Sequence, residues 1–146
     1  MIGAWMAQRR APAVYEALNR RDLEAFLEYW ADNGTFVFPG DIDASGTHSG
    51  KEAVRAWFQG FLEQFSTIRF TIKHVAVADL FDMVGNNVIA MRWEVELTNR
   101  EGFDSHNSGV SVISLRRGKI IRVQDFLFDT GEKFHTAWGQ GKHKEV

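Results

Sequence analysis

Apolar and polar side chains alternate most clearly in the second half of the chain, over residues 86–98. A period of two over this length is typical of a strand in a sheet. One face of the segment is apolar and carries Ile89, Met91, Trp93, Val95 and Leu97. Residues 108–115 are rich in small and β-branched side chains, and residues 120–128 follow them after a short polar sequence at 116–119. These last two segments are expected to form a hairpin.

The first half of the chain has apolar residues at helical spacing, which predicts three helices. The first helix is expected to have Pro12 in its first turn and to end near residue 19. Asp22 is expected to cap the second helix. The third is expected to begin at a capping box over residues 49–52 and to end near residue 65.

Shorter segments complete the pattern. Residues 31–34 are expected to form a turn that leads into a short strand at 35–38, and the polar residues 41–49 are expected to form a loop. Residues 66–77 alternate like a strand, and residues 132–138 are expected to form a short final helix.

The 146 residues are expected to form one domain, 1–146, with flexible ends at 1–10 and 139–146. Helices followed by a run of long antiparallel strands indicate an α+β domain in which the helices pack on one face of a curved sheet.

Composition narrows the range of functions. A net charge of −2 gives no basic surface field, so nucleic acid is not expected as a partner. No cysteine is present, which excludes disulfides and thiolate chemistry. No signal peptide or membrane span is predicted, so the expected location is the cytoplasm and no membrane partner is expected. Twelve Phe and five Trp against two Tyr indicate a large core, an apolar cavity or an oligomer interface.

Asp125 is a carboxylate in an otherwise apolar row of the last strand. It is expected to share a face with Ile121, Val123 and Leu127. A buried carboxyl group needs polar partners or a shifted pKa, because burial of a bare charge is costly. Arg92 and Glu94 are the nearest partners that the pattern offers. Those two residues could instead form an ordinary pair on a solvated sheet face, and Asp125 could simply brace a pocket wall.

Metal and cofactor chemistry are not expected. The histidines are scattered along the chain, and no pair has metal-ligand spacing. His106 lies in a predicted strand and could reach a cavity. Trp57 and Phe61 have the spacing of core residues in the third helix, but side chains of that helix could also line a pocket.

Five short motifs occur in an order that resembles the nuclear transport factor 2-like superfamily. They are NRRDLE at 19–24, WADN at 30–33, GKEAV at 50–54, GKI at 118–120 and DFLFD at 125–129. The superfamily includes the SnoaL-like polyketide cyclases, ketosteroid isomerases, scytalone dehydratases and limonene epoxide hydrolases.

The resemblance covers approximately residues 11–129 and implies a cone-shaped fold. In such a fold, a curved, mainly antiparallel sheet wraps around three N-terminal helices and leaves a pocket open at the wide end. The resemblance also implies a homodimer formed through the sheet.

The site residues of the ketosteroid isomerases are not matched. Their catalytic base would fall at Phe38, their oxyanion-donating Tyr at Val14 and their protonated acid near Ser111. The resemblance therefore does not imply that chemistry.

The limonene epoxide hydrolase pattern is matched in part. Arg92-Trp93-Glu94 resembles the Arg-x-Asp of that family, and Asp125-Phe126 resembles its second Asp before an aromatic residue. The resemblance implies two carboxylates beside an arginine, one acting as a base and the other as an acid. The Tyr and Asn that hold the water in that family would fall near Phe36 and Phe38, which argues against hydrolysis.

Two functions remain open from the sequence. The first is an acid–base enzyme, of isomerase, cyclase or epoxide hydrolase type, that acts on a small hydrophobic molecule without a cofactor. Its catalytic residues would be Asp125, Glu94 and Arg92, and its ligand-binding residues Phe36, Phe38, Trp57, Phe61 and His106. The second is a non-catalytic ligand-binding or dimerisation module with the same pocket.

Overall fold

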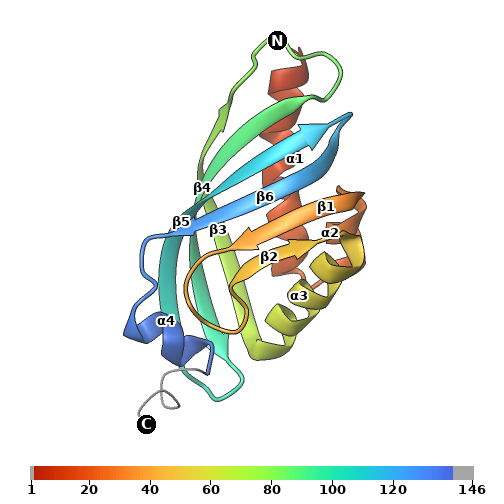
Figure 1. Cartoon of the computed structure of the whole chain (residues 1–146). Coiled ribbons are helices and arrows are strands. Elements are labelled where there is room, and N and C mark those ends of the chain that lie inside the picture. The colour runs from red at the N-terminus through yellow and green to blue at the C-terminus, as the bar shows by residue number, and fades with distance from the viewer. Residues whose placement is uncertain (1, 140–146) are drawn as a thin grey trace.

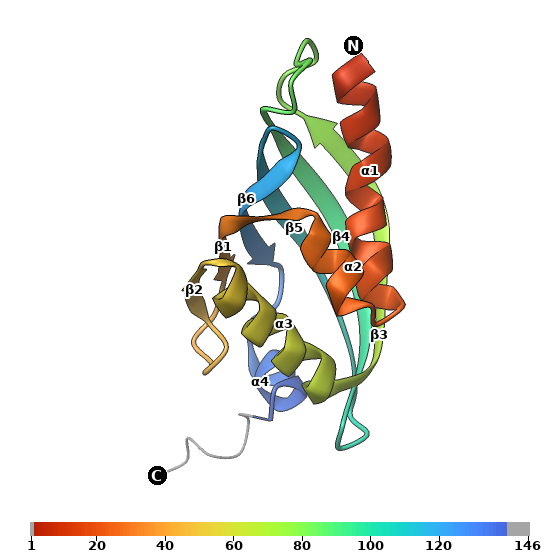
Figure 2. The ribbon, with the colours of Figure 1, turned by 90° about the vertical axis from the view of Figure 1, so that its right-hand side faces the viewer.

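The computed structural model describes residues 2–139 and contains an N-terminal helical part and one sheet (Figure 1). Its helices are α1 (Ile2–Asn19), α2 (Leu23–Glu28), α3 (Lys51–Gln64) and α4 (Glu132–Ala137). Figure 2 shows α1, α2 and α3 on the same face of the sheet, with α4 at the end of the molecule opposite to the start of α1. The α+β class predicted from the order of the elements is confirmed.

The sheet has six strands in the order β2-β1-β6-β5-β4-β3. They are β1 (Trp30–Phe38), β2 (Gly46–Ser49), β3 (Phe65–Val77), β4 (Asn87–Asn99), β5 (Asp104–Arg116) and β6 (Lys119–Leu127). Only the pair of β1 and β6 is parallel within this sheet. The sheet is curved and does not close into a barrel, because β2 and β3 remain as its two edges. The predicted cone of mainly antiparallel strands is therefore confirmed.

The core lies between the helices and the inner face of the sheet. The helices bury Leu18, Phe26, Leu27, Val54 and Phe58, and the sheet buries Trp30, Ile89, Met91, Ile113 and Val123. Each such side chain contributes about 1.5–3 kcal/mol when it leaves water. This shared core fixes α1 and α3 against β3–β6 and so determines the walls of the pocket.

Several local predictions are confirmed. The Asp22 carboxylate accepts a hydrogen bond from the Ala25 N–H at 3.1 Å and caps α2. The three long strands and the hairpin of β5 and β6 are present, as are the strand near residues 66–77 and the final short helix.

The predicted start of the first helix is wrong. Helix α1 begins at Ile2, and Pro12 lies inside it. Residues 2–10, expected to be a flexible end, therefore form the first half of α1. They are mostly good helix formers, and Ala4 is buried. Met1 and residues 140–146 of the expected flexible ends lie outside the described residues.

Three predictions around β1 and β2 are also wrong. Residues 31–34 belong to β1, where a register shift between Trp30 and Thr35 absorbs the turn-forming residues as an irregularity of the strand. The expected loop at 41–49 contains β2. Ser49 belongs to β2 and pairs with Thr35 of β1, so it does not cap α3. Gly50 takes the N-cap position instead, without a side-chain hydrogen bond.

A smaller correction concerns the row of Asp125. The ladder between β5 and β6 shifts register between Ser114 and Leu115, and as a result Ile120 is buried where Ile121 was expected. Val123 is buried as predicted.

Candidate functional site

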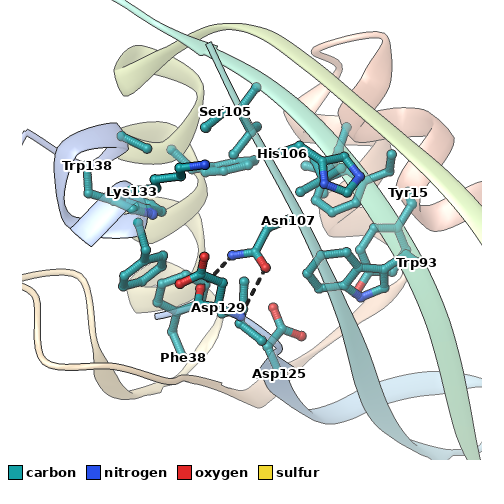
Figure 3. Close-up of a pocket in the computed structure, with 18 of the residues that line it drawn as sticks. Tyr15, Phe38, Trp93, Ser105, His106, Asn107, Asp125, Asp129, Lys133 and Trp138 are labelled. Carbon is teal, nitrogen blue, oxygen red and sulfur yellow. Dashed lines mark hydrogen bonds between the residues drawn. The ribbon is translucent and has the colours of Figure 1, made fainter. Parts of the chain in front are cut away.

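A pocket opens at the end of the cone where α4 lies, between α3, α4 and the inner face of β4–β6. It holds about 690 Å³ of space, its open mouth included. Figure 3 shows Tyr15, Trp93 and Asp125 on one side, and Phe38, Lys133 and Trp138 on the other.

Aromatic side chains form most of the wall. Phe38 and Trp57 have ring centroids 4.7 Å apart, and Trp57 and Phe61 stack at 5.5 Å. Trp138 contacts all three rings. The Trp57 indole N–H donates to the Ala44 carbonyl at 2.8 Å, so its polar atom is satisfied outside the pocket. The wall therefore offers an apolar surface to a ligand.

One group of polar side chains lies at the inner end of this pocket, around the Ser111 hydroxyl. Tyr15 Oη lies 2.6 Å from Ser111 Oγ, and Trp93 Nε1 donates to the same oxygen at 2.9 Å. Ser111 Oγ donates to Asp125 Oδ1 at 2.6 Å. Ser111 itself is fully buried, with 0% of its surface exposed.

The hydroxyl of Ser111 has one proton and two lone pairs, which fixes the direction of these bonds. Its proton goes to the Asp125 carboxylate, and the indole N–H can only donate. The second lone pair therefore accepts from the Tyr15 hydroxyl. When Asp125 is ionised, the Ser111 hydroxyl has no free hydrogen-bonding capacity, and Tyr15 points its proton at Ser111 rather than into the pocket.

The surroundings change the acidity of both ionisable groups. Burial raises the pKa of Asp125 to about 7, and the hydrogen bond from Ser111 opposes that rise. Burial and the nearby Asp125 charge raise the pKa of Tyr15 well above its ordinary value, so Tyr15 keeps its proton. Asp125 is therefore a carboxyl group that can gain and lose a proton near neutral pH.

Strand register explains why these residues meet. Met91, Ser111 and Asp125 are paired side by side across β4, β5 and β6, so their side chains share the inner face. Trp93 lies opposite Gly109, where an added Cβ would lie 2.8 Å from the indole ring. The missing side chain at Gly109 lets the indole lie across β5 and reach Ser111.

Arg92 and Glu94 do not meet Asp125, and the predicted carboxylate pair is not formed. Since Trp93 faces inward, its two neighbours in β4 face outward. Arg92 pairs with Val110 of β5, and Val110 in turn pairs with Phe126 of β6. Glu94 lies 3.6 Å from Lys73 Nζ. The alternative interpretation, an ordinary pair on a solvated sheet face, fits Glu94.

The predicted ligand-binding residues are mostly at the pocket. Phe38, Trp57, Phe61 and His106 line it. His106 is exposed and pairs with Glu96 in the outward-facing row of β4, so it lies at the rim of the pocket rather than on its inner wall. Phe36, which was expected to bind the ligand, does not line the pocket. It is 1% exposed and packs behind the wall against Trp57, with ring centroids 4.6 Å apart.

Sequence reasoning missed Tyr15, Trp93 and Ser111 as polar residues of the site. The resemblance held two signals, because it put a hydroxyl donor at Val14, one residue from Tyr15, and a protonated acid near Ser111. The mouth has a further polar contact, in which the Asn107 side chain donates to the Asp129 carbonyl at 2.8 Å (Figure 3).

Among the described residues, no group of three or more His, Cys, Asp or Glu side chains is arranged to hold a metal ion. None of the helices described has the length and apolar content needed to cross a membrane.

Comparison with known proteins agrees with this fold. Several solved structures resemble the chain along most of its length. Bal32a, from a soil-derived mobile gene cassette, has a TM-score of 0.80 at 19% identity and covers 93% of this chain and 98% of its own. TerC, co-crystallised with polyporic acid, has a TM-score of 0.71 at 20% identity, with 88% and 95% covered. RV0760c from Mycobacterium tuberculosis, in complex with estradiol-17beta-hemisuccinate, has a TM-score of 0.69 at 21% identity, with 85% and 92% covered.

At these identities the structural likeness shows a common fold. A search of curated proteins finds no match. The sequence model of the SnoaL-like domain matches residues 11–123, which is most of the chain. The chain therefore belongs to the SnoaL-like family, within the nuclear transport factor 2-like superfamily.

Proposed function

We propose that this protein is an acid–base enzyme that moves a proton on a small hydrophobic molecule, with Asp125 as the group that accepts and returns the proton. The observation that carries the proposal is the state of this carboxyl group. It lines an aromatic pocket, its pKa is about 7, and Ser111 holds its Oδ1 atom in place. No hydrogen bond joins its Oδ2 atom to another described residue, so this oxygen is available to a ligand.

A base of this kind suits substrates with an acidic C–H group. A carboxylate at its own pKa is half ionised at neutral pH and can take a proton from a carbon next to a carbonyl. The electron pair of the broken C–H bond moves to the carbonyl oxygen and gives an enol or enolate. Return of the proton to a second carbon completes an isomerisation. In a cyclisation, the enolate carbon attacks a second carbonyl, the C=O π bond opens as the C–C bond forms, and the alkoxide takes the proton from Asp125.

The structure favours these reactions over epoxide hydrolysis. The residues that would hold water in the limonene epoxide hydrolases are replaced by Phe36 and Phe38. Phe36 lies in the core and Phe38 adds apolar surface to the pocket. The second carboxylate of that chemistry, Glu94, lies on the other face of the sheet and pairs with Lys73.

The ligands of two similar structures support a small hydrophobic ligand with acidic oxygens. TerC was crystallised with polyporic acid, and RV0760c with an estradiol hemisuccinate. The aromatic wall would serve equally well in a non-catalytic binding protein, which is the alternative that the first experiment tests.

The first prediction concerns Asp125→Asn. This change should lower the rate of proton transfer at least about 100-fold, because it removes the general base. Ligand affinity should change little, because the aromatic wall is intact. Exchange of C–H protons for deuterium can be followed by NMR on a panel of cyclic ketones and polyketide-like enols, with affinity from tryptophan fluorescence.

Glu94→Gln is the matched control, since this carboxylate faces away from the pocket and its loss should leave the exchange rate unchanged. No exchange by the wild-type protein with any bound compound, or an equal loss of affinity and rate in Asp125→Asn, would favour the binding module.

The second prediction concerns stability and pH. The pKa of Asp125 is about 7 in the folded protein and about 3.9 in an unfolded chain. Between these values the folded state holds a proton that the unfolded state has released, so stability falls as the pH rises from about 4 to about 7. The loss should reach up to about 4 kcal/mol.

Urea unfolding at pH 5 and pH 8 measures this change. The Asp125→Asn variant should lose most of the slope, because its side chain does not ionise. An identical slope in both proteins would show that Asp125 does not titrate in this range.

The third prediction concerns Gly109→Ala. The added methyl group would lie 2.5 Å from the Phe126 carbonyl oxygen and 2.8 Å from the Trp93 ring, so both the β6 backbone and the indole must move. Ser111 then loses the hydrogen bond from Trp93, and its own bond to Asp125 becomes weaker. Because that bond lowers the pKa of Asp125, the pH–rate profile of proton transfer should shift to higher pH. Gly60→Ala is the control, because a Cβ at Gly60 meets no atom within 4 Å. An unchanged profile and an unchanged near-UV circular dichroism spectrum in Gly109→Ala would contradict the role of this contact.

We also propose that the protein forms a homodimer through the outer face of the sheet. Phe126 and Phe128 are 48% and 62% exposed there, and Val110 lies beside Phe126 in the ladder. Large apolar side chains gathered on one sheet face are typical of an interface.

The fourth prediction is that wild-type protein sediments as a dimer at micromolar concentration and that Phe126→Glu is monomeric, because the new charge would be buried in the interface. Phe81→Glu, on the connector between β3 and β4, should remain dimeric. A monomeric wild type, or a dimeric Phe126→Glu variant, would rule out this interface.

A further inference from the structure

A second cavity lies at the end of the molecule opposite to α4. It is bounded by the N-terminal half of α1, the connector between β3 and β4 at residues 78–86, and the turn between β5 and β6. It holds about 880 Å³, its mouth included, and shares no lining residue with the first pocket. Figures 1 and 2 both show the start of α1 beside this connector.

Specific backbone contacts hold the rim of this second cavity together. The chain at Gly3 lies so close to the connector that an added Cβ would be 1.9 Å from the Asp82 carbonyl oxygen. At the other side, the Gly118 N–H donates to the Gly85 carbonyl at 3.0 Å, and the Arg117 N–H donates to the Asn86 side chain at 2.9 Å. The three elements are thus joined around the opening.

The connector is also braced internally. Asp82 Oδ1 accepts hydrogen bonds from the backbone N–H groups of Val84, Gly85 and Asn86, at 3.0 to 3.1 Å. This carboxylate therefore has its partners within the loop, and no ion pair joins it to a described arginine.

The inside of the second cavity is apolar and its mouth is cationic. Its floor includes Ile89, Ile113 and Ile120, all of them buried. Arg10, from α1, and Arg117, from the turn, also line it, and both are exposed. Among the described residues, no ion pair or side-chain hydrogen bond engages either guanidinium group.

The backbone of Arg117 has an unusual conformation. Its φ angle is +49°, in the left-handed region that disfavours residues with a side chain. The bond from its N–H to Asn86 Oδ1 holds this conformation, and Gly118 after it also has a positive φ angle, of 79°. As a result, a long cationic side chain occupies a turn position that usually carries Gly or Asn, at the edge of an apolar cavity.

We propose that this cavity is a second binding site, for a small amphipathic anion such as an alkyl or aryl carboxylate. The apolar part lies on the isoleucine floor, and the acid group at the mouth accepts charge-assisted hydrogen bonds from Arg10 and Arg117. This proposal does not rest on the chemistry proposed for Asp125.

The experiment titrates the full-length protein with dodecanoate and, separately, with uncharged dodecanol, by calorimetry and ¹⁵N NMR. Dodecanoate should shift the amide signals of residues 82–86 and 117–118, and these signals report on this cavity separately from any dodecanoate that enters the first pocket. The double variant Arg10→Gln/Arg117→Gln should bind it at least about tenfold more weakly, because two charge-assisted bonds are lost. Its affinity for dodecanol should be unchanged.

Arg116→Gln is the matched control, since Arg116 is exposed in the same hairpin but does not line the cavity. Dodecanoate affinity that is equal in the wild type and the double variant would overturn the proposal. So would NMR shifts confined to the first pocket, or a signal explained by association of two copies of the chain.

Discussion

A single buried hydroxyl group, that of Ser111, joins three parts of the fold at the bottom of the first pocket. It receives hydrogen bonds from α1 through Tyr15 and from β4 through Trp93, and it gives its one proton to Asp125 on β6. Because the hydroxyl has no capacity left, each partner has a defined direction. This centre holds the carboxyl group in position, opposes the rise in its pKa that burial causes, and ties α1 to the sheet beside the apolar core. A small side chain in the middle of β5 therefore matters more than its size suggests.

The strand pattern was enough to predict much of this architecture. Alternation placed Trp93 on the apolar face of its strand, and the row of Val123 and Leu127 marked Asp125 as an inward carboxylate. The motifs from 19–24 to 125–129 gave the correct superfamily. These features are local, since each is carried by a period or a motif within one segment.

The partners of Asp125 could not be predicted in the same way. Which residues meet across a sheet depends on the register between strands, and the alternation that turns Trp93 inward turns Arg92 and Glu94 outward. Tyr15 and Ser111 lie 96 positions apart in the sequence, and neither stands out from its neighbours. The first half of α1 was missed for a related reason, because its close packing at Gly3 against the connector forms only in the folded chain.

Two adjacent residues of helix α1 line two different cavities. Val14 lines the cavity at the connector end, and Tyr15 lines the pocket of Asp125 and contacts Ser111. Any occupant that rotates or shifts the helix at Val14 must also move the Tyr15 hydroxyl. By thermodynamic reciprocity, the factor by which one occupant changes the affinity of the other is the same in both directions. One rigid helix thus forms part of the wall of two chemically different compartments, and a shift of α1 is the route by which an occupant of one would change the affinity of the other.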